Sequence, residues 1–198
     1  MLSRKDFLLQ STIFTTGSFL LPSFTYASVI KQHFGVQLYS FRNEMAKDAI
    51  GTLKQIASLG FKEIETARSQ KGHYYGLAPA EMKGVCKDLN MNLKSGHVHL
   101  DNKWQQTMEE AVESGQEYLI CSSMPSQGQT IDNYKKVAEE FNKAGEACKK
   151  LNLKFGYHNH EYEFETENNQ VLYDVLLKNT EADLVHMELD LGLSLIHI

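Results

Sequence analysis

The stretch LKFGYHNHEYEF, residues Leu153 to Phe164, decides the fold. It is apolar and aromatic up to Tyr157 and then turns polar, as a buried strand of a parallel sheet does when it delivers functional side chains at its carboxyl end. Side chains alternate along a strand, so we expect His158 and His160 to share one face and Asn159 to lie on the other. Two imidazoles at one rim predict either a metal or proton-transfer site or a pair of hydrogen-bonded structural histidines.

Expected strands and helices alternate along the chain on both sides of this stretch. Helical spacing of apolar residues alternates with short β-rich runs, which is the pattern of β/α units in a parallel sheet. We expect the strands at residues 35–42, 61–67, 93–100, 116–124, the stretch quoted above, and 183–191. The helices are expected at 47–59, with Gly60 as its stop, at 78–90, with Pro79 in its first turn, and at 104–114, 131–151 and 170–178.

The polar strand ends favour a barrel over an open sheet. Tyr39, Glu65, His97, Asp190 and the His158–Glu161 segment all fall at or near the ends of expected strands, where a (β/α)₈ barrel places its chemistry. The rival is a doubly wound sheet, which binds phosphate at a glycine-rich first turn, and residues 39–43 (YSFRN) contain no glycine. We therefore predict an α/β fold of the (β/α)₈ TIM-barrel type, with about six β/α units in this chain.

Composition excludes several classes of partner. The 198 residues are 42% hydrophobic and 23% charged, an ordinary globular composition. The net charge of −5 gives no basic surface for nucleic acid or for anionic lipid. Cys86, Cys121 and Cys148 are widely spaced, which predicts three buried thiols rather than a disulfide framework.

The first 28 residues have the pattern of a signal peptide. A basic start is followed by an apolar run and small residues, and Ser3-Arg4-Lys5 resembles a twin-arginine signal with Lys5 in place of the second arginine. Gly17 and Pro22 interrupt the apolar run, so we expect no stable membrane insertion. The prediction is an exported, periplasmic or extracellular protein whose partial barrel spans residues 29–192.

Four motifs carry a family resemblance. GVQLYSFR (35–42), GFKEIE (60–65), YHNHEYEF (157–164) and ELDL (188–191) resemble, in this order, exported bacterial sugar phosphate isomerase/epimerase-like proteins. These belong to the xylose-isomerase-like TIM-barrel superfamily. In that superfamily the fifth strand often ends in Glu-Asn-His, whose Glu binds a divalent metal, and the sixth strand supplies an Asp ligand. The resemblance places these ligands at His158, a departure from Glu, and at Asp190. The ion is expected to be Mn, Zn, Mg or Co.

Other residues receive expected roles beside this metal pair. His160 is the candidate acid or base, although it could instead hydrogen-bond the substrate. Glu188 is either a substrate-binding group or a partner that orients a metal ligand. The remaining predicted substrate-binding residues are Tyr39, Glu65, His97 and Asn159. Structural alternatives are a salt bridge for Glu65, packing in the core for His97 and a buried, hydrogen-bonded hydroxyl for Tyr39.

The end of the chain departs from the family pattern. Residues 193–198 (LSLIHI) resemble a translated sequencing adapter, so we predict a non-native tail and a C-terminal truncation. The resemblance implies two further β/α units, with a His and a Glu metal ligand, beyond Leu191.

The leading functional prediction is a metal-dependent sugar isomerase or epimerase. It would act on a keto-sugar or polyol through an enediolate, as a property of the parent protein, and we expect the fragment itself to be inactive. The partner is a small-molecule carbohydrate, and the oligomeric state is left open. Alternatives are a dehydratase or lyase acting on inosose or keto-glycoside substrates, and a non-catalytic sugar-binding barrel. Phosphodiester cleavage, known in the same superfamily, is disfavoured by the acidic charge.

Overall fold

The structure is a computed structural model that describes residues 34–195. The predicted signal peptide and residues 196–198 of the predicted non-native tail lie outside the described residues. Within the described part, no helix is both long enough and apolar enough to cross a membrane.

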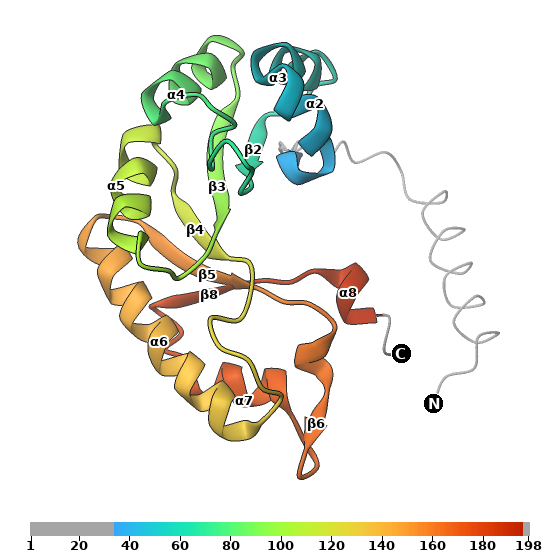
Figure 1. The fold of residues 1–198 in the computed structure, drawn as a ribbon, viewed down its shortest axis with the longest axis vertical. Coiled ribbons are helices and arrows are strands. Elements are labelled where there is room, and N and C mark those ends of the chain that lie inside the picture. Colours follow the sequence, from blue (N-terminus) through green and yellow to red (C-terminus); the bar gives the residue numbers. More distant parts are fainter. Residues whose placement is uncertain (1–33, 196–198) are drawn as a thin grey trace, which may run out of the picture. The chain divides into compact units, whose positions relative to one another are not determined.

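Six parallel strands form one sheet, and each strand lies beside the next one along the chain (Figure 1). A doubly wound sheet reverses its strand order part-way, whereas a TIM barrel keeps it sequential. The fold is therefore of the TIM-barrel type, as predicted, and the chain holds part of a barrel in which β1 and β8 are the two edges of the described sheet. The strands are β1 Gly35–Gln37, β2 Glu63–Thr66, β3 Asn92–Val98, β4 Tyr118–Cys121, β5 Lys154–His158 and β8 Val185–Glu188.

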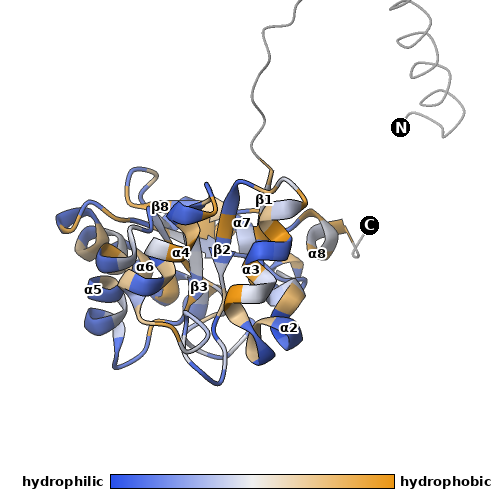
Figure 2. Cartoon of the chain, turned by 90° about the horizontal axis from the view of Figure 1, so that it is seen from above, coloured by the Kyte–Doolittle hydropathy of each residue, from blue (hydrophilic) through white to orange (hydrophobic). Residues whose placement is uncertain are grey.

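Helices connect the strands and cover one face of the sheet. Figure 2 shows that they carry both hydrophilic and hydrophobic residues, as helices with one buried side do. Local signals fix several ends: Asp48 and Thr130 cap α3 and α6, and Gly60 has a φ of 96° after α3. The helices are α2 Arg42–Lys47, α3 Ala49–Ser58, α4 Pro79–Asp88, α5 Trp104–Ser114, α6 Ile131–Lys150, α7 Leu172–Asn179 and α8 Leu191–Leu195.

The hydrophobic core lies between the sheet and these helices. The larger cluster surrounds α6, where Phe141 packs against Phe155 and Tyr157 with ring centroids 5.4 and 4.9 Å apart. A second cluster joins β1 and β2 to α2, α3 and α4. All three cysteines are buried and free, as predicted.

The opposite face of the sheet is polar. Strand register places Gln37 beside Glu65, and Glu65 beside Ser95. On β5 and β8, His158 pairs with Glu188. Side chains alternate along each strand, so these polar residues lie away from the helices while their neighbours in sequence enter the core.

All six expected strands end earlier in the structure than their sequence pattern suggests, and helical turns follow the first and the last of them. The first stops at Gln37, and the chain continues through the 3₁₀ turn η1 (Leu38–Phe41) directly into α2. The last stops at Glu188, and α8 follows. A short hairpin, β6 (Thr166–Glu167) and β7 (Gln170–Val171), follows the 3₁₀ turn η2 (Tyr162–Phe164) and delays α7 to Leu172. Its turn residues Asn168 and Asn169 have positive φ, which asparagine tolerates better than most residues.

Candidate functional site

A cavity of about 740 Å³ lies at the carboxyl ends of the strands. We call it the main cavity. It is lined by every predicted site residue except Asn159, which means that the parallel topology gathers side chains from five strand ends as expected. These lining residues are Tyr39, Glu65, His97, His158, His160, Glu188 and Asp190.

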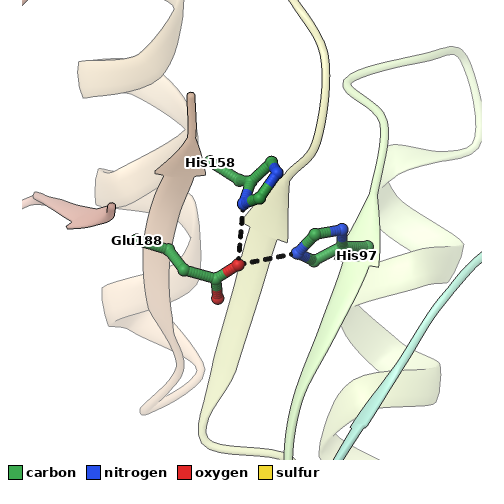
Figure 3. A group of neighbouring side chains, drawn as sticks. All are labelled: His97, His158 and Glu188. Atoms are coloured by element: carbon green, nitrogen blue, oxygen red, sulfur yellow. Dashed lines mark hydrogen bonds and ion pairs between the residues drawn. The ribbon is translucent and has the colours of Figure 1, made fainter. Parts of the chain in front are cut away.

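Three of them form a tight cluster (Figure 3). Glu188 Oε1 lies 2.8 Å from His97 Nε2 and 3.0 Å from His158 Nδ1, and the two imidazole centroids are 4.7 Å apart. The side chains of His97 and His158 are only 10% and 14% exposed. Burial alone would raise the pKa of Glu188, but the hydrogen bonds from the two histidines outweigh it and hold this pKa below its usual range. The cluster therefore contains an ionised carboxylate between two imidazoles.

His158 lies between two carboxylates. Its Nδ1 faces Glu188, while its Nε2 lies 4.0 Å from Asp190 Oδ2. The ring can therefore donate a proton to Glu188 from one nitrogen and keep a lone pair on the other nitrogen, on the side of Asp190. A carboxylate that fixes the tautomer of a metal-binding histidine uses this arrangement.

Glu65 forms the other wall of the cluster. Its Oε1 accepts from Gln37 Nε2 at 2.7 Å and lies 3.2 Å from His97 Nε2, and its Oε2 accepts from Ser95 Oγ at 2.6 Å. Burial raises the pKa of Glu65; the charge of His97 opposes this shift and that of Glu188 adds to it. The Nε2 atom of His97 thus lies between the carboxylates of Glu65 and Glu188.

His160 is held by a buried carboxylate. Glu163 is fully buried, accepts the backbone N–H of His160 at 2.8 Å and a hydrogen bond from the Tyr157 hydroxyl, and its Oε1 lies 3.9 Å from His160 Nδ1. Tyr162 stacks on the imidazole with centroids 5.2 Å apart. The interaction with Glu163 is the main cause that raises the pKa of His160. His160 is therefore an imidazole with a fixed orientation at the cavity wall.

Asn159 lies outside the cavity lining. It is fully buried; its Oδ1 accepts the backbone N–H of Asp190 at 2.9 Å, and its Nδ2 donates to Ser194 Oγ at 3.0 Å. Its amide therefore joins the end of β5 to the segment after β8. The geometry gives Asn159 a positioning task, namely to hold His158 and Asp190 at one rim, rather than a contact with substrate.

Tyr39 and Asp190 lie at the outer part of the site. Tyr39 is 53% exposed, and the guanidinium of Arg42 lies 4.8 Å from its ring centroid. Asp190 lies beyond the end of β8, and its Oδ1 accepts the N–H of Leu193 at 2.8 Å. His186 alternates with Glu188 along β8 but lines a different cavity, in which its ring contacts Tyr118.

Some lining residues were not predicted as site residues. Gln37, Arg68, His99 and Ser122 also line the main cavity. Gln37 shares one face of the first expected strand with Tyr39, a predicted site residue. Strand alternation alone could therefore have predicted that Gln37 faces the cavity. Arg68 and Ser122 follow their strands at positions where no local pattern marks a cavity.

The donor set fits a divalent metal. Among the described residues, His97, His158 and Glu188 offer three ligand atoms within 4.8 Å of one another, and Asp190 adds a carboxylate on the other side of His158. Two imidazoles with carboxylates suit zinc, manganese, cobalt or iron. Because His158 faces Glu188 and Asp190 with different nitrogens, one ion can use only one side at a time.

The fold and the site together define a TIM-barrel α/β protein with its polar site at the strand ends. Two solved structures, both described as a sugar phosphate isomerase/epimerase from Parabacteroides distasonis ATCC 8503, are similar to this chain. One has 26% identity and a TM-score of 0.74 over 82% of this chain and 70% of its own, and the other has 25% and 0.73 over 82% and 69%. D-psicose 3-epimerase from Clostridium cellulolyticum H10, solved with D-tagatose, shares the fold with 11% identity and a TM-score of 0.57 over 79% of this chain and 62% of its own.

These neighbours are sugar isomerases and epimerases of the xylose-isomerase-like fold, in agreement with the predicted resemblance. No protein-family model and no curated protein matches the chain.

Proposed function

We propose that the protein is a metal-dependent sugar isomerase or epimerase that acts on a keto-sugar or polyol. The observation that carries the proposal is the position of His158 between Glu188 and Asp190 at the main cavity. The names of the Parabacteroides neighbours support the substrate class. The signal-like first 28 residues support export, so we further propose a free or glycosidic sugar rather than a sugar phosphate as the substrate.

In this proposal His158 Nε2 and Asp190 hold the ion, and Glu188 keeps His158 in the required tautomer. A divalent ion would supply polarisation of the substrate carbonyl, which acidifies the neighbouring C–H bond. His97, Glu65 and Gln37 form a hydrogen-bonded wall that can bind sugar hydroxyls. Their separations from 2.7 to 3.3 Å keep these groups oriented before substrate arrives.

His160 is the proposed proton carrier. It lines the cavity, and Glu163 and Tyr162 fix its ring. The raised pKa of His160 keeps a larger fraction of its imidazole protonated near neutral pH, so it can return a proton to the substrate and then act again as a base.

The test combines metal binding with product analysis. The full chain, His158→Ala and Asp190→Asn are titrated calorimetrically with Mn²⁺, Zn²⁺, Mg²⁺ and Co²⁺, and each is then incubated with D-fructose, D-tagatose and D-psicose. We expect one ion to bind the unaltered chain and both variants to lose most of this affinity. Ketose binding by the unaltered chain should depend on this ion, and chromatography tests separately the expectation that the 198-residue chain itself converts no ketose. Ketose binding that is the same with and without the ion would favour the sugar-binding barrel instead. Equal metal affinity in all three proteins would refute the proposed ion site.

A further inference from the structure

A second cavity of about 290 Å³ adjoins the main cavity. We call it the outer cavity. Residues from 68–73, after β2, and from 101–110, after β3 and in the first half of α5, line it. Arg68 lines both cavities, so the two share a wall at this side chain. The volume is near the lower end of the range for small-molecule sites, which begins at about 300 Å³.

The charges around the outer cavity balance. Arg68 and Lys103 face Asp101 and Glu110, and Arg68 Nη1 lies 3.8 Å from Asp101 Oδ2. This balance gives no excess of positive charge for a phosphate and no excess of negative charge for a cation. An uncharged ligand with many hydroxyl groups is the class that such a wall of donors and acceptors fits.

His73 has unused hydrogen-bonding capacity. Neither of its ring nitrogens makes a hydrogen bond to any residue between 34 and 195, although the side chain is half-buried and lines the outer cavity. Burial lowers the pKa of His73; Glu110 opposes this shift and Arg68 adds to it. A neutral imidazole offers one donor and one acceptor, which is what a sugar hydroxyl pair requires.

The loop that carries His73 is fixed in place. Ser69 and Gly72 exchange backbone hydrogen bonds of 3.2 and 3.1 Å, and the Tyr74 hydroxyl donates to Gln116 Oε1 at 2.8 Å inside the core. Tyr75 is 3% exposed and has a φ of 56°, a conformation that a bulky residue adopts only where its surroundings impose it. The loop therefore presents His73 in one position, and a ligand meets a pre-organised surface.

We propose that the outer cavity binds a second sugar ring, linked to the ring in the main cavity, with Arg68 at the junction and His73 and Gln106 as the hydrogen-bonding contacts. The substrate is then a glycoside rather than a free monosaccharide. This inference rests on the proposed sugar site in the main cavity and extends it across its rim.

The chain offers a matched control for the test. Gln105 and Gln106 are adjacent, exposed residues of α5, and each donates from Nε2 to a glutamate four residues later, at 2.8 Å to Glu109 and 2.7 Å to Glu110. Only Gln106 lines the outer cavity. Gln106→Ala and Gln105→Ala therefore remove equivalent hydrogen bonds from α5, but only Gln106→Ala also removes a side chain that lines the outer cavity.

The experiment compares D-fructose with three of its glucosides, namely sucrose, turanose and isomaltulose, by calorimetry and ligand-detected NMR on the full chain. At least one glucoside should bind about tenfold more tightly than fructose, the gain expected from one or two net hydrogen bonds. Gln106→Ala and His73→Asn should remove this gain and leave fructose binding unchanged, while Gln105→Ala changes neither.

The outcomes separate the two proposals. If fructose binds but no glucoside binds more tightly, or if Gln106→Ala weakens fructose and glucosides equally, the outer cavity is not a sugar subsite and the proposed function stands. If neither fructose nor any glucoside binds, both proposals are overturned.

Discussion

His158 uses its two ring nitrogens toward two different acids. One faces Glu188 at 3.0 Å within the hydrogen-bonded cluster, and the other faces Asp190 at 4.0 Å across the cavity rim. In this geometry the same imidazole belongs either to an ion site with Asp190 or to one with His97 and Glu188. The side that an ion takes decides whether Glu188 is a ligand or an orienting partner.

Substitution of Glu188 tests this choice. If Glu188 orients His158, Glu188→Gln lowers metal affinity by roughly 10–100-fold, the usual effect of losing an orienting carboxylate. Asp190→Asn should then lower it further, because it removes a ligand. Calorimetric titration of both variants measures the difference. A larger loss with Glu188→Gln than with Asp190→Asn would place the ion between His97, His158 and Glu188.

The buried amide of Asn159 predicts a loss of stability. Asn159→Ala leaves the half-buried Asp190 N–H without its 2.9 Å acceptor, the Oδ1 atom of the fully buried Asn159. Such an unpaired group costs about 1–3 kcal/mol, so the free energy of unfolding should fall by that amount in urea titration. Asn102→Ala, at an exposed loop position, is the control and should stay within about 0.5 kcal/mol of the unaltered chain. Equal effects of the two variants would contradict the positioning role.

His73 predicts a pH dependence of stability. Its pKa is lowered in the folded protein, mainly by burial, from an ordinary value of 6.5. Below pH 6.5 the unfolded chain therefore binds more protons at His73 than the folded protein does. The contribution of His73 to the free energy of unfolding is fully present above pH 6.5 and is lost as the pH falls toward the folded-state pKa. His73→Asn should therefore lose less stability than the unaltered chain between pH 7 and about 5. If the free energy of unfolding of both proteins changes with pH in the same way, the pKa of His73 is not lowered by folding.

At the scale of elements, two helical glycines have opposite surroundings. A Cβ on Gly145 of α6 would lie 2.4 Å from the backbone oxygen of Leu184, whereas a Cβ on Gly84 of α4 would meet nothing within 4 Å. Gly145 therefore allows α6 to approach the segment before β8 closely, while Gly84 has no packing reason to be glycine. The position of β8, and with it of Glu188, depends on this close approach.

Replacing each glycine by alanine should change stability in opposite directions. Gly84→Ala should stabilise the protein by about 0.5–1 kcal/mol through helix propensity. Gly145→Ala should destabilise it by about 1–3 kcal/mol, because the added methyl group displaces the backbone at Leu184. Thermal and urea unfolding of both variants give the comparison. Stabilisation by Gly145→Ala would show that α6 does not limit the position of β8.

Sequence reasoning was most accurate where the signals are local. The β/α alternation, the stop at Gly60 and Pro79 in the first turn of α4 agree with the structure because each depends on neighbouring residues. The first strand was predicted to reach Arg42, but its residues after Gln37 keep a β-rich composition while the backbone turns into η1. Composition does not encode that turn, and so the prediction ran five residues too far.

The contacts of the site depend on pairings that no local pattern contains. His97 meets Glu188 across 91 positions of sequence, and the shift of register between Ile64 and Glu65 aligns Glu65 with Ser95. Strand alternation placed these side chains on one face but could not tell which acid each histidine meets. Asn159 was predicted to bind substrate, although strand alternation already placed it on the face opposite His158. The structure agrees with the alternation, because Asn159 is buried and does not line the main cavity.

At the scale of the whole molecule, the main cavity is formed by residues that are far apart in the sequence. Its residues lie at or just beyond the ends of β1, β2, β3, β5 and β8, which the sheet brings together only when all of these strands are paired. A ligand that contacts several of them binds the folded chain and not the unfolded one. Ligand binding therefore adds to the stability of the fold itself.

A divalent ion should raise the melting temperature of the protein. At a free ion concentration about 100 times Kd, the added stability is roughly 2.7 kcal/mol. For a folded body of about 150–250 residues this corresponds to a rise of about 5–10 °C. A chelator should reverse the rise, and His158→Ala should abolish it. The exposed surface also carries acids, such as Asp183, which pairs with Lys149, so Asp183→Asn is the matched control and should keep the full rise. An equal rise in the unaltered chain and in His158→Ala would assign the effect to such surface acids, and the ion would then have no part in the chemistry of the main cavity.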